Sequence, residues 1–74
     1  MPKYPVLKPD KIIKILMLLG FREARQKGYH KQFKHIDGRL TTIPYHKSKD
    51  ISPLLLKQIL KNINVDLDEF ISHL

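Results

Sequence analysis

The sequence of 74 residues contains no cysteine, and this absence excludes disulfide bridges and zinc sites built on thiolates. No apolar run approaches the roughly 18 residues that a membrane-spanning helix needs. The first residues, Met1–Pro2–Lys3–Tyr4–Pro5, lack the hydrophobic region of a signal peptide. We therefore expect a soluble, cytoplasmic protein without a membrane segment, folded as a single domain over residues 1–74.

Acidic residues are scarce, because seven Asp and Glu oppose fourteen Lys and Arg and leave a net charge of +7. The excess lies in the middle of the chain. Residues 22–49 hold eight basic and two acidic residues, whereas residues 50–74 hold two basic and four acidic residues. Three of the four histidines also fall in residues 22–49. Such a basic segment favours a polyanionic partner, and we expect RNA to bind there.

Apolar residues recur at helical spacing in two segments of the chain. The first begins at Pro9 and stops at Gly20, and the second begins at Pro53 and ends at Asn64. A capping pattern after the second segment predicts a short terminal helix over residues 67–72. The two stripes consist of Ile12, Ile15, Leu16, Leu19, Leu55, Leu56, Ile59, Leu60 and Ile63.

Between the two main helices the sequence predicts three strands, at residues 21–27, 30–36 and 40–43. The last two flank Asp37–Gly38, a strong hairpin signal. An antiparallel sheet needs one covered face, and the two amphipathic helices supply the cover. The predicted fold is therefore an α+β two-layer sandwich, in the order α-β-β-β-α, with a short C-terminal helix and one open sheet face.

The register of the predicted hairpin decides which residues lie on the open face. A two-residue turn would set Ile43 beside Gln32 on the polar side. A three-residue loop with Gly38 left-handed instead places Phe33 and Ile43 on the same side, so we prefer it. The residues that then share the open face are His30, Gln32, Lys34, Leu40 and Thr42.

His30 is the candidate catalytic residue, because it follows Gly28 within a run of cationic side chains. Histidine exchanges protons near neutral pH, and RNA carries its own nucleophile, the 2′-hydroxyl. We therefore expect RNA cleavage with neither metal nor cofactor. Composition alone favours a plainer interpretation of His30 as an ordinary surface histidine. The candidate RNA-binding residues are Arg25, Lys27, Gly28, Tyr29, Gln32, Lys34, Lys47 and Lys49.

Several of these residues have a second interpretation. The cationic side chains, and Arg39 with them, can contact phosphate or simply form a solvated surface. Tyr29 can stack on a base or fill the turn. His46 is a possible accessory acid, or a contact to phosphate. His35 lies two residues after Phe33, so its side chain should point to the same side of the strand, and we expect it to be structural. His30, His35 and His46 share no single face on which they would hold a metal.

The chain contains a distinctive set of residues: Leu16, Leu19, Gly20, Phe21, Arg25 to His30, Phe33, Asp37 to Arg39, Thr41 to Pro44, His46, Leu56, Ile59 and Leu60. Taken together, this set resembles the HicA toxins, also called YcfA-like proteins, over nearly the whole chain. The resemblance implies a fold like that of double-stranded-RNA-binding domains and a type II toxin–antitoxin module. It also implies cleavage of messenger RNA with His30 as the catalytic histidine, and inhibition by a HicB-like antitoxin that covers it.

The chain departs from that family at three places. Tyr29 stands where a serine usually precedes the histidine, Leu54 stands where a glycine is common, and Lys8–Pro9 replaces a small capping residue. We take the last two as structural variation, whereas the first bears on activity. Two alternatives to a nuclease remain open. One is a non-catalytic RNA-binding module, and the other is a decayed toxin that only binds its antitoxin.

Overall fold

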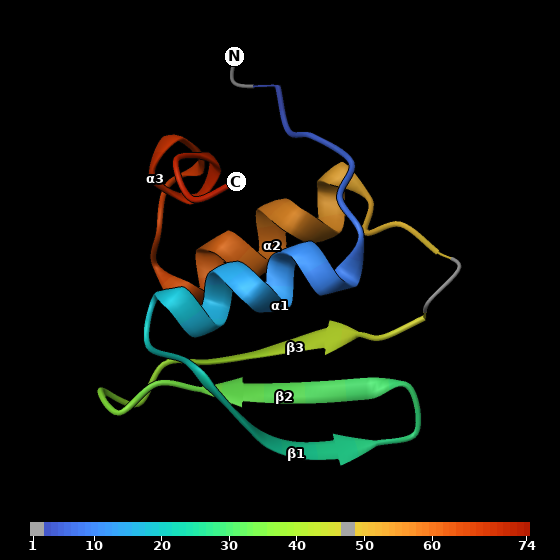
Figure 1. The fold of residues 1–74 in the computed structure, drawn as a ribbon, viewed down its shortest axis with the longest axis vertical. Helices are drawn as coiled ribbons and strands as arrows, with labels where there is room; N and C mark the ends of the chain where they lie inside the picture. The colour runs from blue at the N-terminus through green and yellow to red at the C-terminus, as the bar shows by residue number, and fades with distance from the viewer. Residues whose placement is uncertain (1–2, 47–48) are drawn as a thin grey trace.

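The computed structural model describes residues 3–46 and 49–74, which form three helices and one antiparallel sheet in the strand order β1-β2-β3 (Figure 1). The order of elements confirms the predicted α+β architecture, α-β-β-β-α with a short C-terminal helix. The bounds of the elements are α1 Pro9–Leu18, β1 Arg22–Lys27, β2 His30–Lys34, β3 Leu40–Pro44, α2 Pro53–Ile63 and α3 Leu67–Ile71.

Both main helices end in a left-handed residue. After α1, Gly20 has φ +98°, and the N–H of the next residue, Phe21, donates to the carbonyl of Leu16 at 2.9 Å. After α2, Asn64 plays the same part at φ +56°, and the next N–H again donates to the carbonyl five residues earlier, at 3.2 Å. These bonds satisfy carbonyls that a helix end leaves free, so the predicted stops at Gly20 and Asn64 are confirmed.

The β2–β3 hairpin adopts the predicted bulged loop. The N–H of His35 donates to the carbonyl of Arg39 at 2.9 Å and closes a loop of three residues, of which Gly38 is left-handed at φ +99°. Residues of like parity pair across the strands, for example Gln32 with Thr42. The predicted extension of the second strand to Ile36 is wrong, because the chain turns after Lys34.

The β1–β2 hairpin closes with two residues, Gly28 and Tyr29, between the paired Lys27 and His30. Gly28 has φ +58°, as the first position of a primed turn requires. A bulge between Glu23 and Arg25 shifts the register. Arg25 and Lys27 consequently lie opposite Gln32 and His30 and share their face of the sheet.

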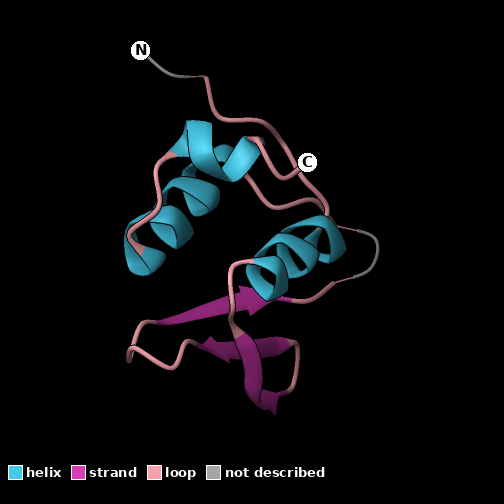
Figure 2. Cartoon of the chain, turned by 60° about the vertical axis from the view of Figure 1, so that its left-hand side comes forward, coloured by secondary structure: helices cyan, strands magenta, loops and turns pink. Residues whose placement is uncertain are grey.

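The helices lie over one face of the sheet and leave the other face bare (Figure 2). Their buried stripes meet Phe33 and Ile43, and α3 adds Phe70. All six residues of β1 are exposed, so the cover extends over β2 and β3 and not over the whole sheet. The cause is the sequence of β1, Arg-Glu-Ala-Arg-Gln-Lys, which has no large apolar side chain to bury.

Within the described ranges, 3–46 and 49–74, no helix is both long and apolar enough to cross a bilayer.

Candidate nucleic-acid interface

A shallow hollow of about 500 Å³ lies on the bare face of the sheet. Residues of all three strands line it, and we call it the basic hollow: Arg25, Lys27, His30, Gln32 and Thr42. Strand pairing alone brings them together, since Lys27 faces His30, Arg25 faces Gln32, and Gln32 faces Thr42. Four of the five were candidates from the sequence. Thr42 was expected on this face but was not named as a site residue.

His30 is the first residue of the central strand, and its side chain is exposed. Its neighbours across the sheet are Lys27 on one side and Pro44 on the other. The imidazole is therefore on the solvent side of the sheet and not in the layer that faces the helices. At this position a ligand lying across the three strands would reach it directly.

The lining of the basic hollow includes two cations, Arg25 and Lys27, and no carboxylate. A phosphate in the hollow would lie beside a guanidinium, which can donate two parallel hydrogen bonds, and an ammonium. The amide of Gln32 and the hydroxyl of Thr42 add neutral donors. The residue types of this surface thus suit a phosphodiester.

Tyr29 stacks on His46 next to the basic hollow. The ring centroids are 4.1 Å apart and the ring planes differ by 25°. The N–H of Tyr45 donates to the carbonyl of Tyr29 at 2.5 Å, so the β2–β3 ladder continues past Pro44 and brings His46 to the turn. The sequence argument missed this stack, although the like-parity register, extended by one step, pairs residue 29 with residue 45.

The remaining candidates lie outside the hollow. Lys34 is exposed at the far end of β2, opposite Leu40 and on the same face as His30. Gly28 forms the turn, and Lys49 is exposed in the segment before α2. The candidate Lys47 lies outside the described residues.

Lys31, in β2, points away from the basic hollow. Its ammonium lies 4.2 Å from the centroid of the Tyr45 ring and 3.7 Å from the carboxylate of Glu23. On the same side of the sheet, a hydrogen bond to the carboxylate of Asp10 raises the pKa of the Tyr45 hydroxyl. These contacts occupy the side that faces the helices, so Lys31 does not belong to the basic hollow.

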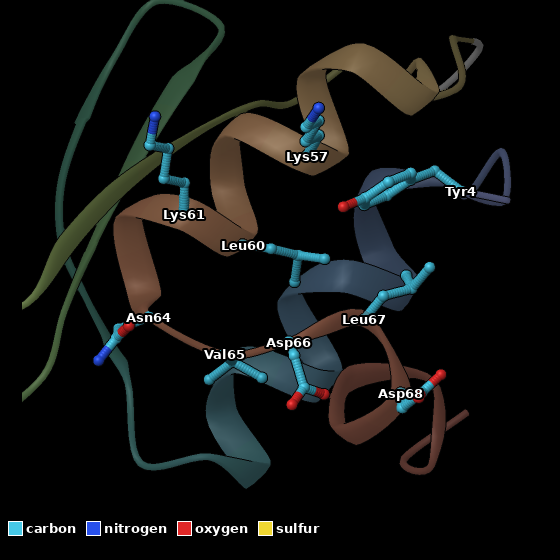
Figure 3. Close-up of a pocket in the computed structure, with 9 residues that line it drawn as sticks. All are labelled: Tyr4, Lys57, Leu60, Lys61, Asn64, Val65, Asp66, Leu67 and Asp68. Atoms are coloured by element: carbon cyan, nitrogen blue, oxygen red, sulfur yellow. The ribbon is translucent and has the colours of Figure 1, made fainter. Parts of the chain in front are cut away.

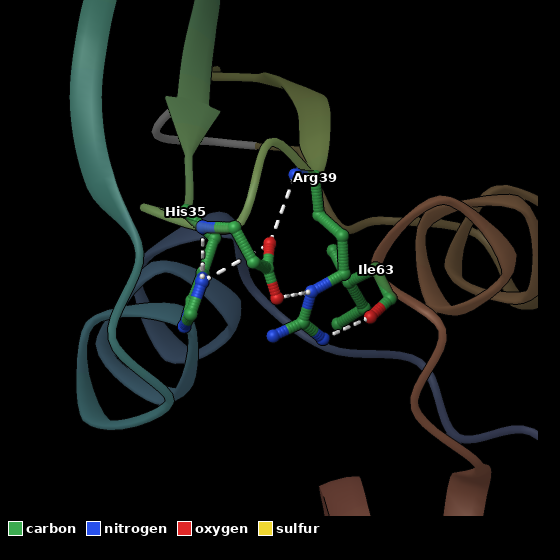
Figure 4. Close-up of polar contacts among 4 residues, drawn as sticks. His35, Arg39 and Ile63 are labelled. Carbon is green, nitrogen blue, oxygen red and sulfur yellow. Dashed lines mark hydrogen bonds and ion pairs between the residues drawn. The ribbon is translucent and has the colours of Figure 1, made fainter.

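His35 has the structural position that its parity predicts (Figure 4). Its ring packs edge-on against Phe21 with centroids 5.1 Å apart, and its Nδ1 accepts a hydrogen bond from the N–H of Asp37 at 3.1 Å. Only 18% of the side chain is exposed. In the part of the chain that the structure describes, no three His, Asp or Glu side chains gather as metal ligands would.

A second and larger groove, about 710 Å³, lies in the helical layer between α2, α3 and Tyr4 (Figure 3). Lys57 and Lys61 line it together with Asp66 and Asp68, so its charges cancel. None of its lining residues comes from the sheet. This groove therefore attracts a polyanion less strongly than the basic hollow does.

The sequence model of one protein family matches residues 9–65 of the chain, and its description is HicA toxin of bacterial toxin–antitoxin. The matched stretch begins with α1 and ends just after α2. It includes the whole basic hollow and both residues of the Tyr29–His46 stack. Among curated proteins, none matches the chain.

Proposed function

The chain belongs to the HicA toxin family of bacterial toxin–antitoxin systems, and on that premise we propose that it cleaves messenger RNA at the basic hollow. The observation that supports this proposal best is the position of His30. Its imidazole is exposed at the start of the central strand, in a hollow that also contains Arg25 and Lys27. A phosphodiester in the hollow would thus meet a proton-transfer group and two cations on one surface.

The reaction we propose uses the 2′-hydroxyl of the substrate as nucleophile. Its oxygen attacks the adjacent phosphorus as its proton leaves, the bond from phosphorus to the 5′-oxygen breaks, and that oxygen takes up a proton. The products end in a 2′,3′-cyclic phosphate and a 5′-hydroxyl. His30 either accepts the first proton as neutral imidazole or donates the second as imidazolium, a role typically worth ~10²–10⁴-fold in rate.

Arg25 and Lys27 complete the proposed site. The phosphorane carries one negative charge more than the phosphodiester, and fixed cations that lie where this charge develops stabilise it. Because the nucleophile comes from the RNA itself, the step requires neither a metal ion nor a cofactor. DNA lacks this hydroxyl and is not a substrate.

A toxin of this family requires an antitoxin, and we propose a HicB-like protein whose acidic side chains cover the basic hollow. Opposite charges at such an interface accelerate association and exclude RNA at the same time. Messenger RNA is cytoplasmic, so the complex would form in the cytoplasm.

The test compares the wild-type chain with His30→Ala on an RNA oligonucleotide and on the same oligonucleotide with single 2′-deoxy substitutions. We expect His30→Ala to cleave at least ~10²-fold more slowly while its circular dichroism spectrum is unchanged. The 2′-deoxy linkage should resist cleavage. His73→Ala is the matched control, because His73 is exposed beyond α3 and should be dispensable.

Three outcomes would contradict the proposal. If His30→Ala cuts RNA as fast as the wild type, the imidazole is not catalytic. If the wild type binds RNA and cuts none, the chain is an RNA-binding module, and if it binds only its antitoxin, it is a decayed toxin.

A further inference from the structure

Tyr29 is a large aromatic side chain that remains 63% exposed beside the basic hollow. His46 covers one side of its ring at a centroid distance of 4.1 Å. The next residue along the chain is His30, the first residue of β2. An aromatic surface therefore lies one residue away from the proposed proton-transfer group.

The backbone on both sides of the stack is fixed. The hydrogen bond from the Tyr45 N–H to the Tyr29 carbonyl joins the two segments, and Gly28 at φ +58° sets the turn. Contact with His46 then restricts the Tyr29 ring. Ordering a flexible side chain on binding costs conformational entropy, and a ring already held in place avoids part of that cost.

An exposed, ordered aromatic ring suits one ligand chemistry in RNA, the flat face of a nucleobase. Stacking of a base on a protein aromatic is worth about 1–3 kcal/mol per base. Only an unpaired base offers this face, because bases within a duplex are already stacked on each other. An RNA whose phosphate lies in the basic hollow would bring the base of a neighbouring nucleotide to Tyr29.

We propose that the Tyr29–His46 stack is a subsite for an unpaired nucleobase next to the cleaved linkage. Tyr29 contacts the base and His46 is a positioning residue that holds the ring. The adjacency to a cleaved linkage rests on the proposed function, whereas the recognition of an unpaired base does not. A stack that serves only to fill the turn would affect stability and be insensitive to the base.

The first experiment measures binding in the His30→Ala background, in which the RNA stays intact. Adding Tyr29→Leu should weaken the binding of single-stranded RNA by about 5- to 150-fold. An oligonucleotide with one abasic ribose at the matching position should lose the same factor, and the two losses should not add. Tyr4→Leu, in the groove of the helical layer, is the aromatic control and should not change RNA affinity.

The second experiment uses tyrosine fluorescence, which is observable because the chain has three tyrosines and no tryptophan. Single-stranded RNA should quench part of the emission, and Tyr29→Leu should abolish that part. His46→Ala should weaken binding less than Tyr29→Leu does, and should have no further effect once Tyr29 is leucine. That dependence distinguishes positioning of the ring from direct contact between His46 and RNA.

Three results would overturn the subsite. They are additive losses from Tyr29→Leu and the abasic position, an equal loss with fully duplex RNA, or quenching that persists in Tyr29→Leu. Failure of the proposed cleavage looks different. In that case the wild type cuts no RNA, yet the non-additive loss and the Tyr29-dependent quenching are still observed, and they support the base subsite.

Discussion

The guanidinium of Arg39 donates a hydrogen bond to the backbone carbonyl of Ile63, which joins the β2–β3 hairpin to the last turn of α2 (Figure 4). The same side chain donates to the carboxylate of Asp37 at 2.8 Å and lies over the ring of Phe21, 5.1 Å from its centroid. Carbonyls at a helix C-terminus lack helical partners and favour a cation. Arg39 is therefore a structural residue within the basic segment.

Replacing Arg39 with methionine should destabilise the fold and spare RNA binding. The change removes a charged donor from a partly buried carbonyl, which costs about 1–3 kcal/mol of unfolding free energy. Urea denaturation measures the loss, and RNA affinity is compared under conditions where both proteins are folded. Lys57→Met removes an exposed cation from α2 and is the control. An equal loss of stability in both variants would contradict the assigned role of Arg39.

Local sequence signals were sufficient for most of the fold. Gly20, Asn64 and the Asp37–Gly38 loop each determine the backbone of their own neighbours, and the loop then determines which residues share a face. That register places three residues of the basic hollow, His30, Gln32 and Thr42, on one face. The other two, Arg25 and Lys27, were named from their charge and reach this face through the β1–β2 pairing.

Contacts between distant side chains could not be predicted in the same way. Arg39 reaches a carbonyl 24 residues away, and Tyr29 meets His46 only because the ladder extends beyond β3. Both contacts depend on rotamers and on how the chain leaves a strand, and periodicity carries no information about either. The exposure of β1 was readable, since the strand has no large apolar residue, but the expectation of one covered sheet face made no exception for this strand.

Stability should depend on the ionisation of Asp37 in acid. A hydrogen bond from the Arg39 N–H to its carboxylate lowers the pKa of Asp37 below its ordinary value of 3.8. A carboxylate whose pKa is lower in the folded state stabilises the fold above the unfolded pKa, and this contribution is lost as pH falls through the folded pKa. Asp37→Asn should therefore be less stable than the wild type near neutral pH.

The measurement is urea denaturation at about pH 6 and at about pH 2.5. The stability difference between wild type and Asp37→Asn should shrink at the lower pH, because a larger fraction of the wild-type carboxyl is protonated there and no longer carries its charge. Asp68→Asn, an exposed change in the first turn of α3, corrects for the removal of one carboxylate. A difference that stays constant across this range would show that ionised Asp37 does not stabilise the fold.

Alanine at Gly20 should be more damaging than alanine at Gly38. The two glycines have nearly the same φ, +98° and +99°, so the backbone strain of about 1–3 kcal/mol is common to both substitutions. A Cβ at Gly20 would also lie 2.9 Å from Nε2 of His35, whereas a Cβ at Gly38 meets no atom within 4 Å. The excess loss of unfolding free energy at Gly20 measures that contact.

A double variant checks this reason. In a His35→Ala background the ring is absent, and Gly20→Ala should then destabilise no more than Gly38→Ala does. If the excess at Gly20 persists without the ring, the close approach of His35 does not explain it.

RNA binding should weaken with salt in proportion to the phosphates held at the basic hollow. Each phosphate neutralised on a single strand contributes about 0.7 to the slope of log affinity against log salt. Arg25→Gln and Lys27→Gln, measured with His30→Ala to preserve the RNA, should each lower affinity and flatten the slope by about that amount. Lys57→Gln removes one positive charge from α2 and is the control. It lowers the net charge as much as the other two variants do, but it should leave the slope unchanged.

A variant of Lys34 tests in which direction the RNA crosses the sheet. It lies on the face of His30 but at the other end of β2, outside the basic hollow. RNA that crosses the three strands at the hollow would miss Lys34, so Lys34→Gln should resemble Lys57→Gln. RNA that runs along β2 would contact it, and Lys34→Gln should then flatten the slope as Arg25→Gln does. If all four variants share one slope, binding depends on net charge, and the basic hollow does not hold the phosphates.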